Sequence, residues 1–278
     1  MQQLSALNIP QSGPEMSPLD VALVDVVAGV KEVQIWGRLG WRETKLRYRR
    51  TVFGPFWSTL SLAVFVVALG LVWSNLWQQD PKTYLPFLTS GMLSWVLFSS
   101  MANEGCTTVI SYEALIKQLR ISYTLLGCAI VWRNLIVFFH NLVIYVFVCI
   151  YAGLSVSWAM LLVVPGLAIL TLNGLWIAVL LGALCARFRD IQQLVGSLLQ
   201  ISLFLTPIFW SVDQLKGKAS VLAEFNPLYH LIAIVRDPLL GNMPDPLHWI
   251  VAVIVAILGW ALTIQVMSKL RHRIVYWL

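Results

Sequence analysis

The feature that most constrains this chain is an uncharged apolar run at residues 51–77, which directly follows a basic string at residues 42–50. About 20 apolar residues suffice to cross roughly 30 Å of hydrocarbon as an α-helix, so the run is long enough to span a bilayer. Cations crowded against one end of a span mark its cytoplasmic side. The sequence therefore predicts a membrane protein whose first span begins in the cytoplasm.

The composition agrees with a membrane location. Charged residues make up 12% of the 278 residues and hydrophobic residues 59%, whereas a soluble domain carries about 25% charged residues. A net charge of +6 would also fit a nucleic-acid-binding protein, but the basic residues here lie beside apolar runs, which fits membrane anchoring. We expect no nucleic-acid partner. The four cysteines form no CxxC pair, and we interpret them as packing residues without a disulfide or metal role.

Six apolar runs predict an all-α polytopic membrane protein with both termini in the cytoplasm. The expected spans are residues 52–77, 83–103, 134–153, 158–186, 191–212 and 248–268. On these boundaries all but four of the 19 Lys and Arg residues face the cytoplasm. The four exceptions are Lys82, Lys216, Lys218 and Arg236. Pro165 in the fourth run and Pro207 in the fifth predict interrupted helices.

The segments that flank the membrane domain at residues 51–268 have different characters. Residues 1–18 predict a flexible cytoplasmic tail, residues 19–50 an amphipathic interface helix region, and residues 269–278 a C-terminal cytoplasmic tail. Four cations in the interface region share one helical face, where they would lie near lipid phosphates. They are Arg38, Arg42, Lys45 and Arg49. Either this helix lines a cytoplasmic entrance for an anionic substrate, or it only orients the first span.

Two short pieces of the chain are not expected to span. Residues 104–133 form a moderately polar insert that predicts a short helix outside the membrane, in which Glu113 and Lys117 can pair at a spacing of four. The apolar piece at residues 227–235 would be roughly 14 Å long as a helix, so it is re-entrant or interfacial. Asn226 is suited to its N-cap and Pro227 to its first helical position.

A search for catalytic chemistry finds none of the common motifs. The chain contains no P-loop, no HExxH zinc motif, no GxSxG and no GxGxxG after a strand, so we do not expect it to hydrolyse ATP in the usual way. His140, within the third run, is either a proton carrier or a helix–helix hydrogen-bond partner. The carboxylates fall at the ends of the runs or outside them, which counts against proton-driven transport.

Aromatic residues are abundant in and beside the apolar runs. Their faces stack on the apolar C–H faces of sugars, so aromatic residues along a channel would offer a path for a polysaccharide. The candidates for such a substrate path are Trp57, Trp95, Phe98, Phe204 and Trp260. Lipid-facing and packing roles are the alternatives for each of them.

Several short motifs occur in a characteristic order. They are residues 47–57 (Arg-Tyr-Arg-Arg-Thr-Val-Phe-Gly-Pro-Phe-Trp), 186–191 (Ala-Arg-Phe-Arg-Asp-Ile), 206–210 (Thr-Pro-Ile-Phe-Trp) and 225–228 (Phe-Asn-Pro-Leu), followed by Arg236, Asp237 and Gly241. From residue 40 to the end, this set resembles the permease subunits of bacterial type-2 ATP-binding-cassette (ABC) exporters of polysaccharides. The nearest in pattern are the Wzm-like permeases of O-antigen and capsule exporters. Residues 1–30 contribute nothing to the resemblance.

The resemblance implies a homodimer that works with two copies of a separate cytoplasmic ATPase. That ATPase would bind ATP and magnesium, so no cofactor or metal is expected in this chain. The helix that couples to the ATPase would comprise Ser111, Tyr112, Glu113, Ala114, Leu115, Ile116, Lys117 and Arg120. Short outer helices would form a gate that includes Pro207, Asn226, Pro227, Tyr229 and Arg236. The inner-face motif would be Arg187, Arg189 and Asp190.

We therefore expect a non-catalytic permease subunit for ATP-driven export of an undecaprenyl-linked polysaccharide across the bacterial inner membrane. Arg38, Arg42, Lys45 and Arg49 would attract the pyrophosphate of the lipid carrier. Export of teichoic acid or of a smaller amphiphile is a near alternative. A membrane-embedded glycan-processing enzyme and a structural scaffold are alternatives of other classes. A glycan-processing enzyme would require paired acidic residues on an aqueous loop. A scaffold would not need interrupted spans.

Overall fold

The computed structural model describes residues 17–54, 56–76, 78–119, 121–212 and 223–278. Every regular element in these ranges is a helix, which confirms the predicted all-helical membrane protein. The elements are α1 (Pro18–Lys31), α2 (Val33–Tyr48), α3 (Phe56–Leu76), α4 (Pro81–Ser111), α5 (Glu113–Gln118), α6 (Tyr123–Ala152), η1 (Trp158–Leu162), α7 (Val163–Arg187), α8 (Ile191–Leu205), α10 (Pro227–Leu239) and α11 (Pro246–Trp277).

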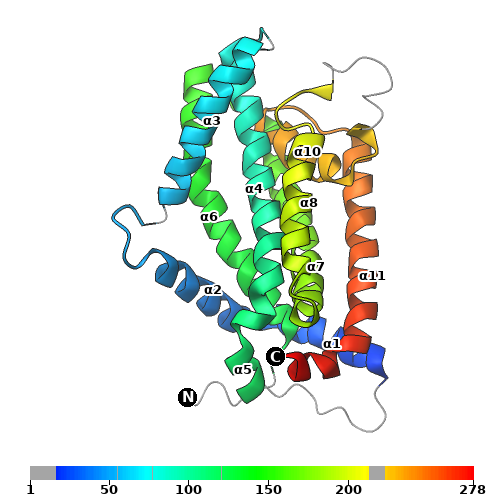
Figure 1. The fold of residues 1–278 in the computed structure, drawn as a ribbon. Helices are drawn as coiled ribbons and strands as arrows, with labels where there is room; N and C mark the ends of the chain where they lie inside the picture. Colours follow the sequence, from blue (N-terminus) through cyan, green and yellow to red (C-terminus); the bar gives the residue numbers. More distant parts are fainter. Residues whose placement is uncertain (1–16, 55, 77, 120, 213–222) are drawn as a thin grey trace.

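The long helices run side by side in alternating directions, so the bundle has two distinct ends (Figure 1). The α5 end carries α1, α5 and the C-terminus. The opposite end, here the α10 end, carries α10 and the turn between α3 and α4. Helix α2 leaves the bundle obliquely near the α5 end, and α3 begins at a level above it. Helices α2 and α5 therefore lie near the same end of the bundle (Figure 1).

Five helical segments in the described part of the chain are long and apolar enough to cross a membrane. They are Phe56–Leu76, Pro81–Ser111, Tyr123–Ala152, Trp158–Arg187 and Pro246–Trp277. Helix α8 has 15 residues, about 22 Å, which falls short of a bilayer core. The helix ends earlier than the predicted fifth span because Thr206 is extended (ψ 137°), as a residue before proline prefers. The count of six spans therefore stays a prediction.

Other boundaries also differ from the expected ones. Helices α4 and α6 extend beyond the second and third predicted spans toward the α5 end, and α11 continues to Trp277, so the predicted C-terminal tail is helical. The interface region is two helices that meet at Glu32. Pro165 lies in the first turn of α7, where its missing N–H costs no hydrogen bond, and the interruption falls earlier, in the 3₁₀ turn η1.

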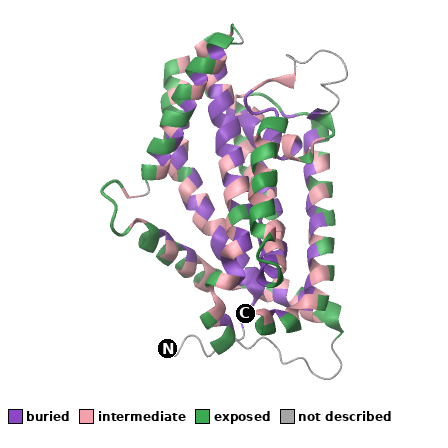
Figure 2. Cartoon of the chain, viewed as in Figure 1, coloured by how far each residue is buried: buried purple, intermediate pink, exposed green. Residues whose placement is uncertain are grey.

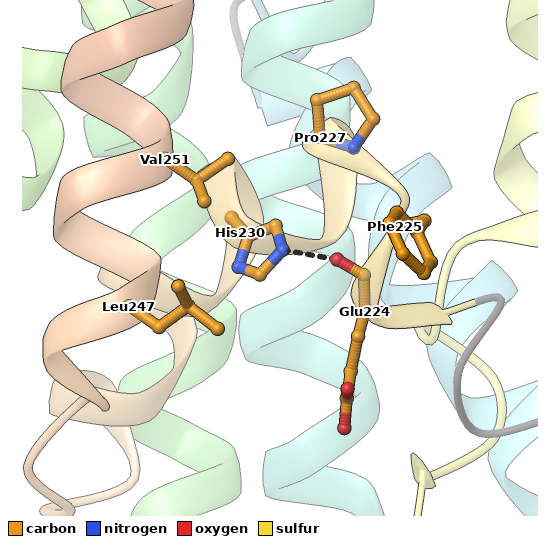
Figure 3. Close-up of a pocket in the computed structure, with 6 residues that line it drawn as sticks. All are labelled: Glu224, Phe225, Pro227, His230, Leu247 and Val251. Carbon is orange, nitrogen blue, oxygen red and sulfur yellow. Dashed lines mark hydrogen bonds between the residues drawn. The ribbon is translucent and has the colours of Figure 1, made fainter.

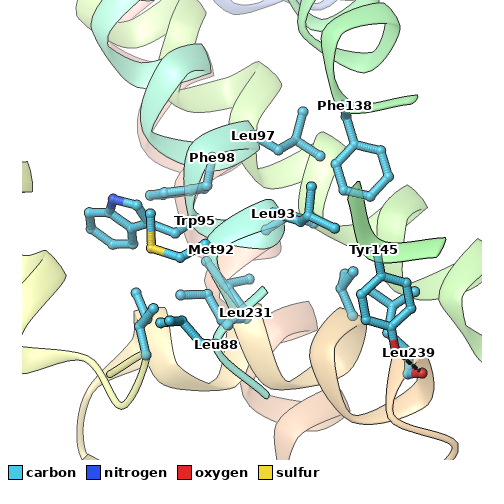
Figure 4. Packing of buried hydrophobic residues seen from close by; sticks show 14 of the residues in the cluster. Leu88, Met92, Leu93, Trp95, Leu97, Phe98, Phe138, Tyr145, Leu231 and Leu239 are labelled. Atoms are coloured by element: carbon cyan, nitrogen blue, oxygen red, sulfur yellow. Dashed lines mark hydrogen bonds between the residues drawn. The ribbon is translucent and has the colours of Figure 1, made fainter. Parts of the chain in front are cut away.

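Helix α4 is the centre of the bundle. It is the most buried of the long helices and contacts α3, α6, α7, α8 and α10, whereas α8 is largely exposed (Figure 2). The apolar side chains of α4 form a continuous core with those of α6 and α10. Across that core Tyr145 of α6 donates a hydrogen bond to the Leu239 carbonyl of α10 (Figure 4).

Close contact between α4 and α7 depends on Gly105. A Cβ atom at Gly105 would lie 2.6 Å from the Cα of Ala178, closer than real Cβ atoms approach backbone. Both residues are small, which is how helices approach one another in a membrane. The α4–α7 contact therefore has no room for one more methyl group.

We expect Gly105→Ala to lower the free energy of unfolding by about 1–3 kcal/mol, because overpacking forces backbone to move. Unfolding by sodium dodecyl sulfate in mixed micelles measures this. Gly196→Ala on α8 is the matched control, since its Cβ would meet nothing closer than 3.9 Å. Equal stability of the two variants would contradict the assigned α4–α7 contact.

Candidate functional site

Helix α5 forms the tip of the hairpin made by α4 and α6 at the α5 end. Ile116 is buried in a cluster with Val109 and Tyr123, so it fixes α5 to the hairpin. Ser111, Ala114 and Lys117 face outward, and Lys117 donates to Glu113 at 2.6 Å. Of the predicted coupling residues, Leu115 and Tyr112 are half-buried. Arg120 lies outside the described residues.

The predicted row of cations is exposed along α2. Arg38, Arg42 and Lys45 are exposed on the helix, and Arg49 is exposed at its C-cap. The ammonium of Lys45 lies 5.6 Å from the ring centre of Trp41. The row is thus positioned to meet anions outside the bundle.

The opposite face of α2 carries a feature that the sequence analysis did not identify. Glu43 and Arg47 point toward the bundle, where Glu43 pairs with Arg133 of α6 and Arg47 pairs with Glu104 of α4. Arg133 also pairs with Glu104 at 2.6 Å. Long-range charge contacts of this kind leave no local sequence signal. The sequence offered only an indirect indication, which is that the opposite charges Glu104 and Arg133 lie at the two ends of the predicted polar insert.

A second buried carboxylate fixes α1 at the α5 end. Asp25, 2% exposed, accepts hydrogen bonds from Ser122 and Thr124 at the start of α6 and pairs with Arg271 of α11 at 3.1 Å. The backbone N–H of Thr124 also donates to it at 3.1 Å. An acidic side chain at the start of a helix satisfies free N–H groups and complements the helix dipole. Asp25 therefore caps α6 from another helix.

The predicted inner-face motif lies between α7 and α8. Arg187 ends α7, with its guanidinium 4.9 Å from the ring centre of Phe188 and 5.2 Å from that of Trp277. Arg189 and Asp190 are exposed in the turn, with Asp190 at the N-cap position of α8. The motif packs the end of α11 against the turn.

At the α10 end, Arg236 joins α10 to the segment that follows α8. Its side chain is 6% exposed and donates to the Pro207 carbonyl at 2.8 Å and to Asp237 at 3.0 Å. The guanidinium also lies over the rings of Phe87 and Tyr229. One buried cation thus holds together four of the groups around the predicted gate. Arg236 was one of the four outer exceptions to the positive-inside pattern, and its contacts explain why it is found there.

Asn226 and Pro227 begin α10 as predicted from the sequence. The Asn226 side chain caps the N–H of Leu228 at 3.0 Å and donates to Thr206 at 3.0 Å. Pro227 is at the first helical position. The helix is buried from His230 to Arg236, so it is embedded in the bundle. The predicted gate residues Pro207, Asn226, Tyr229 and Arg236 therefore come together on two adjoining segments.

An open pocket of about 360 Å³ lies beside the start of α10 (Figure 3). Its lining is Glu224, Phe225, Pro227, His230, Leu247 and Val251. The Nε2 atom of His230 donates to the Glu224 carbonyl at 2.6 Å, and its Nδ1 lies 2.7 Å from Nδ1 of His248. This pair joins the starts of α10 and α11.

The predicted aromatic path residues are not brought together within one protomer. Trp95 and Phe98 are buried in the core of α4, where they serve packing. Trp57 and Phe204 are exposed on α3 and α8, and Trp260 packs half-buried against the cluster near α1. His140 donates to the carbonyl of Ile136 in its own helix, at 2.7 Å. Among the described residues no group of three His, Cys, Asp or Glu is placed to hold a metal ion.

Comparison with known proteins identifies the family. Residues 34–240 match the ABC-2 type transporter family. The chain belongs to this family. It is similar to two O-antigen export system permease proteins RfbA of Klebsiella pneumoniae, 25% identical over 239 residues and 22% identical over 236, each over 84% of this chain and 90% of the relative. It is also 25% identical over 225 residues to an RfbA protein of Myxococcus xanthus, over 79% of this chain and 86% of the relative.

The matched range shows which parts of this ABC-2 transporter chain are family features. It includes nearly all of α2, the α4–α5–α6 hairpin and α10, and excludes α1 and the whole of α11. The predicted resemblance to polysaccharide-exporter permeases is confirmed at the level of the family and of these relatives. The chain is a multi-pass membrane protein of this family.

We expect Arg236→Met to lower the free energy of unfolding by at least about 2 kcal/mol, because the Pro207 carbonyl loses a buried charged donor. Unfolding in mixed micelles provides the measurement. Arg236→Lys is the control, since it keeps a cation beside Asp237 that can donate to the Pro207 carbonyl, and its cost should be clearly smaller. The assigned role of Arg236 fails if the two variants are equally stable.

Proposed function

We propose that this chain is the transmembrane subunit of an ATP-driven exporter that moves a lipid-linked polysaccharide of the O-antigen or capsule type across the bacterial inner membrane. The observation that carries the proposal is similarity over most of the chain to permeases described as O-antigen export proteins. The working unit is two copies of the chain with two copies of a separate cytoplasmic ATPase. The chain itself is non-catalytic.

In this proposal the α5 end faces the cytoplasm, with both termini, and α5 docks on the ATPase. The outward positions of Ser111, Ala114 and Lys117 support this, because the contact surface is presented at the very tip of the hairpin while Ile116 fixes the helix from behind. Gln118 is also exposed and extends the surface. The short helix gains rigidity from this packing, which its own length does not supply.

The exposed cations of α2 attract the pyrophosphate of the lipid carrier. Arginine binds phosphate oxygens in a fork of two hydrogen bonds, and three of the four cations are arginines. Because α2 lies beside the bundle below the start of α3, the row lies at the entrance that the glycan must pass (Figure 1).

Helix α8 offers a surface for the glycan path between two copies of the chain. Gln193, Ser197, Gln200 and Phe204 recur at intervals of three and four residues, and all are exposed. Exposed polar side chains are costly against hydrocarbon, so this face requires water or a second protomer. Amides and a hydroxyl can bind sugar hydroxyl groups, and the Phe204 ring can stack on a sugar face. The first three of these residues were not among the sequence candidates.

At the other end, α10 and the segment around Pro207 form the gate through which the glycan leaves. The buried Arg236 contacts support this, because they hold the two segments in one arrangement that an opening motion must break. The capping of α10 by Asn226 and the bond from Asn226 to Thr206 tie the same two segments together.

The coupling role of α5 is tested with the double variant Glu113→Arg, Lys117→Glu. The change reverses the two charges but keeps an oppositely charged pair at a spacing of four, so α5 should fold as before. We expect ATP hydrolysis by the reconstituted complex to fall at least tenfold, while expression of the chain is unchanged. Normal hydrolysis in the variant would contradict docking through α5, and a chain that never copurifies with an ATPase would contradict the proposed function.

The cation row is tested by neutralising Arg42 and Arg49 together as glutamine. Loss of two phosphate contacts should raise, at least tenfold, the concentration of undecaprenyl-pyrophosphate-linked oligosaccharide that half-saturates export in proteoliposomes. Lys31→Gln is the control, because Lys31 is an exposed cation at the end of α1 outside the row. Equal half-saturation in both variants would remove the row from the binding site.

A further inference from the structure

Helix α2 has two charged faces with different environments. The exposed cation row lies on one face, and Gly40, Glu43, Thr44 and Arg47 lie on the opposite face, toward α4 and α6. Any displacement of the inward face therefore moves the cation row by a similar amount, because a helix of this length behaves as a rigid rod.

The inward face approaches α6 closely at Gly40. A Cβ atom there would lie 2.7 Å from the Ala129 carbonyl oxygen. The rings of Trp36 and Trp132 meet edge to face nearby, with centres 6.1 Å apart. The first half of α2 is thus held by packing against α6 and by a hydrogen bond of 3.2 Å from the Trp36 indole N–H to the Val30 carbonyl of α1.

The second half of α2 is held by four alternating charges on three helices. In order they are Glu43 of α2, Arg133 of α6, Glu104 of α4 and Arg47 of α2. The Oε1 atom of Glu104 accepts from Arg47 at 2.7 Å, and Oε2 accepts from Arg133 and from Asn134, each at 2.6 Å. Both oxygens are therefore used, and the quartet has no net charge.

The environment of the quartet makes its contacts hard to exchange for water. The side chains of Arg133, Glu104 and Glu43 are 13%, 18% and 22% exposed. Burial raises the pKa of the Glu43 carboxyl, and the charge of Arg133 only partly offsets this. Removing one partner from such a group leaves a poorly solvated charge behind. Arg47, at 44% exposure, is the member that can be changed with least damage to the rest.

The quartet also sits on both stems of the hairpin that carries α5. Glu104 lies about two helical turns before the end of α4, and Arg133 about three turns after the start of α6. A displacement of α5 would therefore move the adjoining ends of α4 and α6, and the quartet links both of these helices to α2.

We infer that the Glu43–Arg133–Glu104–Arg47 quartet is the link by which movement of α5 repositions the cation row of α2, so that ATP hydrolysis moves the carrier phosphate. This inference rests on the proposed function. The four residues are positioning residues, since none of them is placed in contact with the substrate. Arg47 is the link from α2 to α4, and Glu43 the link from α2 to α6.

The first test measures movement directly. Spin labels at Gln34 of α2 and Ile257 of α11, both exposed, report the distance between these helices in complexes diluted with unlabelled protomers. We expect this distance to change between the ADP and trapped-ATP states, and the change to be at least halved in Arg47→Gln. An unchanged distance in the wild type, or an equal change in the variant, would overturn the inference.

The second test measures the number of undecaprenyl-pyrophosphate-linked oligosaccharides exported per ATP hydrolysed. We expect this ratio to fall at least fivefold in Arg47→Gln and to recover to at least half of the wild-type value in Arg47→Lys. The matched control is Arg271→Gln, which removes an ion pair with Asp25 at the same end of the bundle but leaves α2 untouched. Its ratio should stay within twofold of the wild type.

The remaining outcomes are also decisive. If Arg47→Gln does not assemble, Glu43→Gln replaces it, with the same expected fall in the ratio. If neither assembles while Arg271→Gln does, or if hydrolysis and export fall together at a constant ratio, the quartet serves stability alone and the inference is wrong. A wild-type complex that hydrolyses ATP without exporting the oligosaccharide would instead contradict the proposed substrate, and the spin-label distances would still decide the inference.

Discussion

The close packing of α4 against α6 and α7 is the constraint on which the rest of the structure depends. In hydrocarbon there is no hydrophobic gain from bringing helices together, so contact must come from shape and from polar bonds. Gly105 against Ala178 and Gly174 against Met101 allow α4 and α7 to approach. Once α4 is enclosed, its two ends become fixed reference points. Its first turns hold the segment after α8, where Tyr84 donates to the Phe209 carbonyl at 2.7 Å, and its last turns hold α2 through Glu104.

Three charged side chains with little exposure then hold the two ends of the bundle together, and their partners come from distant parts of the chain. Asp25 joins α1 to α6 and α11, Glu104 joins α2 to α4 and α6, and Arg236 joins α10 to the segment around Pro207. Each charge is compensated by an opposite charge and by hydrogen bonds, as a buried ionic group must be. These contacts are specific in geometry, and they fix the elements that a packed apolar surface alone would leave free to slide.

The surfaces left exposed have the properties required by a permease subunit. At the α5 end, α5 presents a small polar surface and α2 a row of cations, and the hairpin of α4 and α6 lies between them. Helix α8 presents amides and an aromatic ring along one face. This arrangement places the region proposed to receive force, the region proposed to bind phosphate and the region proposed to contact glycan on separate helices around one enclosed core.

The sequence by itself determined the all-helical membrane fold, because 59% hydrophobic residues in long uncharged runs have no other stable arrangement in lipid. It also determined the start of α10, since Asn226 and Pro227 act through local backbone chemistry, and the short helix between α4 and α6. Only the tertiary structure decided the length of α8, the burial of Trp95 and Phe98, and the partners of Asp25, Glu104 and Arg236. These depend on contacts between residues up to about 250 positions apart, for which helical periodicity carries no information.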